Sequence, residues 1–137
     1  MRTTKDLTRQ ALVVGLLCAA AVSSTTGRQE TTPARVVHVA AERFAFVPSE
    51  ITAEEGETLE LRLTSDDTIH GFRLVGPGGA GTDVAIPKRG RGDVRVRFEA
   101  STPGRYTFEC SRVCGAGHGF MRGTVQVKAR PSPGGGS

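Results

Sequence analysis

CSRVCGAGHGFM, at residues 110–121, is the most informative segment of this 137-residue chain. It brings two thiols, an imidazole and a thioether together, from Cys110, Cys114, His118 and Met121. Thiolate and thioether sulfur select soft metals, and imidazole suits copper, zinc and iron. Structural zinc sites use cysteine, histidine and carboxylate ligands, so the methionine argues against zinc. A methionine just after a cysteine and a histidine matches the weak axial ligand of copper electron-transfer centres, so the segment favours copper.

Each of these side chains also has a simpler interpretation. In an exported protein, Cys110 and Cys114 could form a disulfide across the loop. Met121 could fill the core beside Phe120, and His118 could be a surface residue among glycines. The spacings taken together, with a suitable distant histidine, favour the metal site over this set of independent explanations.

A suitable histidine lies upstream, in the second of two expected strands. Residues 59–64 alternate strictly between apolar and polar side chains, which predicts a half-buried strand, and a turn follows. The next strand is expected over residues 69–75, and its period of two places His70, Phe72 and Leu74 on one face. We therefore interpret His70 as a metal ligand. His38 has no other donor nearby in sequence, and we expect it on the surface of a strand.

The two segments together resemble a known family. DTIHGF at residues 67–72, followed by C-x3-C-G-x2-H-x2-M at 110–121, closely resembles the binuclear copper (CuA) domain of cytochrome c oxidase subunit II. The same centre occurs in nitrous oxide reductase, and both belong to the cupredoxin superfamily. The resemblance covers residues 35–129. It implies that Cys110 and Cys114 are bridging thiolates and that His70 and His118 bind one copper each. It also implies two weak ligands, Met121 on one copper and the backbone carbonyl of Arg112 on the other.

Two features depart from the family pattern. Arg112 stands where many oxidase subunits carry glutamate, which changes the local charge but leaves the main-chain ligand in place. The chain also has no tryptophan, whereas many subunits II use an exposed aromatic pair containing it for electron entry. Entry would then use another route, such as Phe72 or Phe120. Asp67 is the candidate to hold the free ring N–H of His70, and its alternative role is to cap its own turn.

The resemblance implies electron transfer through two coppers, as oxidase subunit II or as a free-standing relay of that kind. Expected partners are cytochrome c or another small redox protein, and haem-copper oxidase subunit I. Two alternatives stay open: a copper carrier or assembly protein, and a mononuclear blue-copper carrier. In the mononuclear case His70, Cys114, His118 and Met121 form the ligand set and Cys110 is not a ligand. No catalytic triad or carboxylate pair is visible, so we expect no catalysis from the isolated chain.

The rest of the sequence predicts an all-β fold. Short alternating segments are separated by turn signals rich in glycine and proline, which is typical of a sandwich or barrel. We therefore predict a Greek-key, cupredoxin-like sandwich. Its strands are expected at residues 36–40, 50–53, 58–64, 69–75, 82–86, 93–99, 105–110 and 123–128.

The ends of the chain are expected to lie outside this sandwich. Residues 1–23 combine a basic start with an apolar segment at 11–22, which predicts a secretory signal. As a helix that segment would span about 18 Å, short of the roughly 30 Å hydrocarbon core. Cys18 follows two leucines and faintly resembles a lipoprotein acylation site. We expect a linker at 24–34, a disordered tail at 130–137, and a periplasmic location or one on the outer face of the cytoplasmic membrane. Any membrane association would come from lipidation or a partner subunit.

Charge excludes some partners. The chain holds 18 Lys+Arg and 14 Asp+Glu, of which residues 1–23 contain three and one, so removing them leaves a net charge of +2. This small net charge, and the lack of a basic patch interleaved with aromatic residues in the sequence, argue against nucleic acid as a binding partner. The basic run at residues 88–91 is interpreted as a solvated hairpin tip. Arg73, Arg112 and Arg122 lie near the ligands in sequence, and a ring of them would favour an acidic or apolar redox partner.

Overall fold

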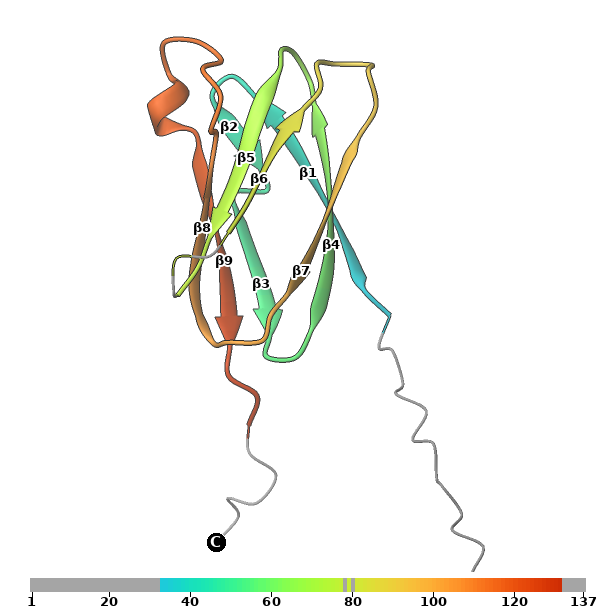
Figure 1. Ribbon diagram of the computed structural model, residues 1–137, viewed down its shortest axis with the longest axis vertical. Coiled ribbons are helices and arrows are strands. Elements are labelled where there is room, and N and C mark those ends of the chain that lie inside the picture. Colours follow the sequence, from blue (N-terminus) through green and yellow to red (C-terminus); the bar gives the residue numbers. More distant parts are fainter. Residues whose placement is uncertain (1–32, 78, 80, 132–137) are drawn as a thin grey trace, which may run out of the picture. The chain divides into compact units, whose positions relative to one another are not determined.

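The computed structural model describes residues 33–77, 79 and 81–131, which form a sandwich of two β-sheets (Figure 1). In spatial order, the four-stranded sheet contains β2 (Ala45–Val47), β1 (Arg35–Glu42), β4 (Thr58–Ser65) and β7 (Val94–Glu99). The five-stranded sheet contains β3 (Glu50–Glu54), β9 (Arg122–Lys128), β8 (Gly104–Glu109), β5 (His70–Val75) and β6 (Gly81–Ile86). The predicted signal segment, Cys18, most of the linker and the last six residues lie outside the described part of the chain.

The connectivity is that of a Greek-key sandwich, as predicted. Successive strands repeatedly change sheets, so that β1 pairs in parallel with β4, and β3 pairs in parallel with β9. The remaining neighbours are antiparallel. Within the described ranges, no helix is long and apolar enough to cross a bilayer.

All eight expected strands are present, with ends that differ by no more than two residues. The prediction missed β2, a three-residue strand that pairs with the end of β1. It also missed η1 (His118–Phe120), a single 3-10 turn inside the segment at 110–121.

Alternating side chains build the core between the sheets. In β4 the leucines at positions 59, 61 and 63 are fully buried while their neighbours face outward. The centre of the core is a cluster of three rings, from Phe46, Phe72 and Phe108, with centroids 5.1 to 5.8 Å apart. Such aromatic pairs add about 0.5–1.5 kcal/mol each beyond the burial of their surface. Because Phe72 and Phe108 lie two residues from His70 and Cys110, the cluster forms the layer beneath those two donors.

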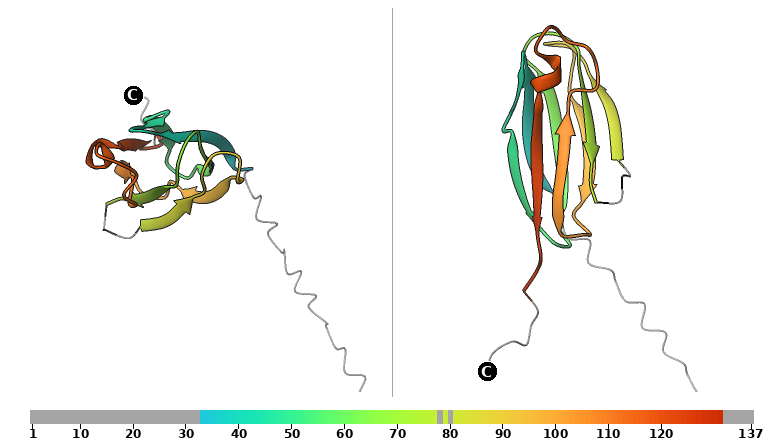
Figure 2. Two further views of the ribbon diagram at one scale, coloured as in Figure 1. Left: turned by 90° about the horizontal axis from the view of Figure 1, so that it is seen from above. Right: turned by 90° about the vertical axis from the view of Figure 1, so that its left-hand side faces the viewer.

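Four connections meet at one end of the sandwich, opposite the start of β1 and the end of β9 (Figures 1 and 2). They are residues 43–44, 66–69, 87–93 and 110–121. The site residues predicted from sequence lie in these connections or beside them, so we call this end the metal end.

Candidate metal centre

The ends of three strands position the candidate ligands. β5 begins with His70, β8 ends one residue before Cys110, and β9 starts one residue after Met121. The Cys110 N–H donates to the Met121 carbonyl over 3.0 Å, which closes the base of the intervening loop. All three strands are in the five-stranded sheet, so one sheet fixes both ends of the loop and the distant histidine.

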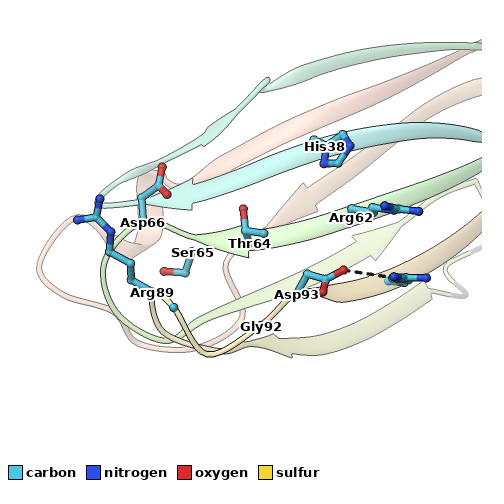
Figure 3. Close-up of a pocket in the computed structure, with 10 residues that line it drawn as sticks. His38, Arg62, Thr64, Ser65, Asp66, Arg89, Gly92 and Asp93 are labelled. Atoms are coloured by element: carbon cyan, nitrogen blue, oxygen red, sulfur yellow. Dashed lines mark hydrogen bonds and ion pairs between the residues drawn. The ribbon is translucent and has the colours of Figure 1, made fainter.

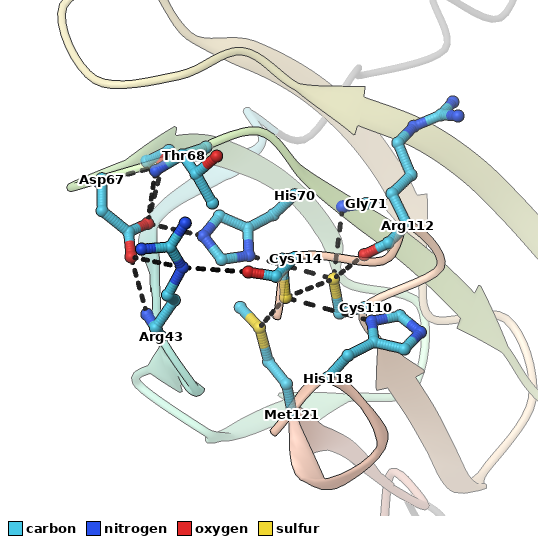
Figure 4. Close-up of polar contacts among 11 residues, drawn as sticks. Arg43, Asp67, Thr68, His70, Gly71, Cys110, Arg112, Cys114, His118 and Met121 are labelled. Atoms are coloured by element: carbon cyan, nitrogen blue, oxygen red, sulfur yellow. Dashed lines mark hydrogen bonds and ion pairs between the residues drawn. The ribbon is translucent and has the colours of Figure 1, made fainter. Parts of the chain in front are cut away.

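The donor atoms converge on one point beneath the loop (Figure 4). The Cys110 and Cys114 sulfurs are 3.7 Å apart, each cysteine sulfur is 3.9 Å from a histidine Nδ1, and Met121 Sδ is 4.0 Å from Cys114 Sγ. The Arg112 carbonyl oxygen lies 3.1 Å from Cys110 Sγ. Two ligands bound at about 2.0–2.3 Å with a tetrahedral angle between them are about 3.5 Å apart. The separations are therefore on the scale of donors that share a metal ion.

The disulfide interpretation is wrong. Cys110 and Cys114 are free thiols in this structure, and their 3.7 Å separation is well beyond the bond length of about 2.05 Å. Met121 is indeed buried, with 1% exposure, but its sulfur faces Cys114. His118 lies at the outer edge of the cluster and is half-buried.

Burial sets the electrostatics of the thiols. His70 is 0% exposed, and Cys110 and Cys114 are 5% and 7% exposed. One ligand atom from each of these three residues lies within 4.8 Å of the others. Burial, with the hydrogen bond and charge of Cys110, raises the pKa of the Cys114 thiol to about 11. A metal cation would favour the thiolate form, so metal binding here would displace protons.

A hydrogen-bonded pair fixes the orientation of His70. Its Nε2 lies 2.6 Å from Asp67 Oδ1, which leaves Nδ1 facing the Cys110 sulfur. Asp67 also accepts the Thr68 N–H over 2.7 Å, so the two roles considered for this aspartate are both present. Partial burial of Asp67 opposes ionisation, but its bonds from His70, Thr68 and Arg43 outweigh that and lower the pKa of the carboxyl.

Sequence reasoning missed Arg43 and Phe44, in the connection between β1 and β2. The Arg43 Nε–H donates to the Cys114 carbonyl over 2.9 Å, and its backbone N–H donates to Asp67 Oδ2 over 3.1 Å. Arg43 thus joins the thiol loop to the carboxylate that holds His70. A Cβ atom on Gly117 would lie 2.3 Å from the Phe44 ring, so only glycine allows this close packing. No local sequence pattern marks either residue.

The Arg112 side chain is exposed and extends away from the thiols, while its carbonyl faces them (Figure 4). Of the two aromatic routes considered for electrons, Phe72 is fully buried and Phe120 is 83% exposed. A hollow of about 170 Å³ opens beside the loop, and Cys110, His118 and Met121 contribute to its lining.

His38 lies on the surface of β1, as predicted, and is not among the clustered donors. It borders a groove of about 640 Å³ on the outer face of the four-stranded sheet (Figure 3). Two arginines of this groove are neutralised locally, because Arg62 pairs with Glu60 at 2.7 Å and Arg95 with Asp93 at 3.4 Å.

Comparison with known proteins found similar sequences and similar folds. No protein-family model matches the chain. Over 92 residues the chain is 34% identical to a cytochrome c oxidase subunit 2 of Thermus thermophilus, a match covering 67% of this chain and 64% of the relative. A second Thermus thermophilus sequence of that name is also 34% identical over 92 residues, and the match covers 52% of it. The chain therefore spans less than two thirds of the length of these relatives.

Solved structures agree on the fold. A chain of a heme-copper terminal oxidase dimer superposes with a TM-score of 0.55 at 27% identity, over 69% of this chain and 65% of that one. The periplasmic domain of cytochrome oxidase subunit II from Bradyrhizobium japonicum gives a TM-score of 0.57 at 21% identity, over 72% and 87%. The sandwich is therefore similar in sequence to part of cytochrome c oxidase subunit 2, and its fold is cupredoxin-like.

Proposed function

We propose that this chain transfers electrons through a binuclear copper centre at the metal end. The proposed ligands are the side chains of His70, Cys110, Cys114, His118 and Met121, and the Arg112 carbonyl. The observation that carries the proposal is the run of donors from one imidazole through two thiols to the other, each step 3.7 to 3.9 Å. One thiolate would suffice for a mononuclear site, whereas two adjacent thiolates suit a bridged pair.

Held by the Cys110 and Cys114 thiolates with the other proposed ligands, a pair of coppers would supply one-electron redox chemistry in which the change of charge on transfer is spread over two metals. The protein contributes by limiting movement of the ligands. Asp67 holds the His70 ring, Arg43 holds the Cys114 carbonyl, and the Phe46–Phe72–Phe108 cluster supports both strands from below. Burial of both sulfurs keeps water away from the centre. Ligands held in this way change little between oxidation states, as an electron relay requires.

Copper loading tests the proposal directly. The loaded chain should give an EPR signal in which one unpaired electron is delocalised over two coppers, at a stoichiometry of two coppers per chain. A signal from a single copper would contradict it. Cys110→Ser should abolish the binuclear spectrum, whereas a mononuclear blue-copper protein would keep its metal and colour. Ser101→Ala is the control, since it removes an exposed polar side chain in the connection between β7 and β8, outside the segment at 110–121.

A filled centre also leaves no position for oxygen. Catalytic metal sites keep one open coordination position, whereas all donors proposed here come from the protein. The copper-loaded chain with reduced cytochrome c alone should therefore consume no oxygen. Oxygen reduction would require a haem-containing partner such as subunit I of a haem-copper oxidase. We place the chain accordingly as an exported domain, residues 35–129, that acts on the periplasmic side of the cytoplasmic membrane.

One observation favours a second candidate, a copper carrier. The hollow of about 170 Å³ borders Cys110, His118 and Met121, which gives a chelator access to one side of the centre. A carrier should lose copper to a competing chelator within seconds to minutes and should not exchange electrons with a redox protein. An electron relay should retain copper under the same conditions, because both thiols are buried.

A further inference from the structure

The metal end exposes four large apolar side chains in and around the loop. Val113 and Phe120, both in the segment at 110–121, are 87% and 83% exposed. Ile69, which precedes His70, is 51% exposed, and Phe44, which packs on the loop, is 38% exposed. These four side chains come from three of the four connections at that end, and we call them the apolar tip. Isolated exposed apolar residues are ordinary, but a group beside a buried centre marks a contact surface.

The charge around the apolar tip is mainly positive. The four connections contain five basic and three acidic residues: Arg43, Lys88, Arg89, Arg91 and Arg112 against Asp66, Asp67 and Asp93. Two of these acidic residues form ion pairs, Asp67 with Arg43 at 3.9 Å and Asp93 with Arg95 at 3.4 Å, and the Asp66 side chain is exposed. Throughout the ranges that the structure describes, Lys88, Arg89, Arg91 and Arg112 form no ion pair.

Two acidic side chains next to the loop share one arginine. Asp83 accepts a 2.6 Å hydrogen bond from the Ser111 hydroxyl and pairs with Arg73 at 3.2 Å. Glu109 pairs with the same arginine at 3.4 Å. A basic partner approaching the tip would therefore meet four unpaired basic residues, whereas four of the nearby carboxylates already contact an arginine: Asp67, Asp83, Asp93 and Glu109.

The opposite end of the sandwich is close to balanced in charge. Its connections contain Glu55 and Glu57, but Glu57 pairs with Arg35, and the Arg130 guanidinium lies against Gly56 between the two glutamates. The unpaired basic residues are therefore a feature of the metal end, and they attract an acidic partner towards the apolar tip during diffusional encounter.

We propose that the apolar tip, with its border of unpaired basic residues, docks a redox protein whose contact face is acidic around an apolar centre. This rests on the proposed electron-transfer function and specifies the partner of the same site. One electron passes between the partner's redox group and the copper centre, so that one is oxidised as the other is reduced. Phe120 and Val113 provide the dry contact, and Lys88, Arg89, Arg91 and Arg112 attract and orient the partner.

The test uses one haem protein with two surface charges. Native cytochrome c is basic, and cytochrome c with succinylated lysines is acidic while its haem is retained. Second-order rate constants for electron exchange with the copper-loaded full chain are measured by stopped flow against ionic strength. At low salt the acidic form should react faster, and its rate constant should fall by about tenfold or more as salt is raised. The rate constant of native cytochrome c should rise. A faster reaction with native cytochrome c at low salt, or no salt dependence for either, would overturn the proposal.

Variants locate the effect. The double variant Lys88→Glu/Arg91→Glu reverses two charges outside the loop at residues 110–121. It should slow electron exchange with the acidic partner several-fold, and only at low salt. The double variant Arg105→Glu/Lys128→Glu makes the same charge change at the start of β8 and the end of β9, away from the metal end. It should slow the same reaction much less. Equal slowing by both pairs would mean that net charge, not the metal end, selects the partner, and the proposal would be wrong. Phe120→Ser should lower the rate constant at every salt concentration.

A small reagent separates this inference from the function on which it rests. Hexaammineruthenium(II) needs no protein docking surface to reduce the copper centre. If the loaded chain accepts an electron from it but favours the basic cytochrome, only the partner assignment is wrong. If the chain cannot be reduced and reoxidised even by small reagents, the electron-transfer function fails and this proposal fails with it.

Discussion

Replacing Asp67 by alanine removes the one hydrogen-bond partner that the described residues offer to Nε2 of His70. The ring is 0% exposed, so this nitrogen cannot turn to bulk water. Leaving a buried polar group without a partner costs about 1–3 kcal/mol. The Arg43 and Thr68 N–H groups also lose their acceptor, but Arg43 is exposed and Thr68 is only half-buried, so water replaces those bonds at little cost. We therefore expect the metal-free chain to lose about 2 kcal/mol of unfolding free energy.

The effect on copper should be larger than the effect on folding alone. Loss of the partner that orients a ligating histidine typically lowers metal affinity about 10–100-fold. The variant should therefore release copper to a competing chelator at about one tenth to one hundredth of the chelator concentration that the parent chain requires. Urea unfolding of the metal-free chain and chelator competition of the loaded chain measure the two quantities separately.

Asp66→Ala is the matched control. Asp66 is exposed and adjacent, and its carboxylate makes no hydrogen bond or ion pair with any residue placed by the structure. It removes the same charge but should change neither quantity appreciably. Asp67→Asn keeps an acceptor oxygen for the ring without the charge, so it should fall between Asp67→Ala and the parent chain. If Asp67→Ala and Asp66→Ala behaved alike, the His70–Asp67 contact would have no role in holding the site, and this reasoning would be refuted.

Phe108→Ala should lower the unfolding free energy by about 3–5 kcal/mol, because it opens a cavity in the three-ring cluster; urea denaturation measures this. Gly117→Ala should weaken copper binding in chelator competition and alter the copper spectrum, since the new Cβ would lie 2.3 Å from the Phe44 ring and displace the loop. The metal-free chain should lose stability as pH rises above about 8.5, because the unfolded chain then loses a thiol proton that folded Cys114 keeps to about pH 11. Copper affinity should rise with pH over the same range, since binding displaces that proton; urea unfolding and chelator competition at several pH values check both signs.

The strands could be predicted because their alternation reflects one buried face. Residues 94–99 show this most clearly, with buried Val96 and Phe98 between exposed Arg95, Arg97 and Glu99. Strand β2 could not be predicted in the same way. Three residues are too few to show a period, and Pro48 directly after it reads as a turn.

The donor cluster could be predicted because four of its side chains share one loop and His70 is in phase with buried strand residues. The residues that brace it could not. Arg43 reaches the Cys114 carbonyl across 71 positions in sequence, and the contact exists only because the β1–β2 connection folds over the loop. Phe44 packs on Gly117 for the same reason. Both contacts depend on how the two sheets stack, which no short segment of sequence encodes.

The two sheets make different contributions to the metal end, and this couples metal binding to folding. The strands that carry the donors all belong to the five-stranded sheet, whereas Arg43 follows β1 and Asp67 follows β4, both in the four-stranded sheet. Separating the sheets would therefore remove the brace from His70 and from the Cys114 backbone at once. A metal that binds only the closed arrangement stabilises the whole sandwich by mass action, by about 4 kcal/mol when free metal exceeds its dissociation constant a thousandfold. Loss of copper and unfolding of the sandwich should then occur as one transition. While both Arg43 contacts persist, the loop at residues 110–121 should not open by itself.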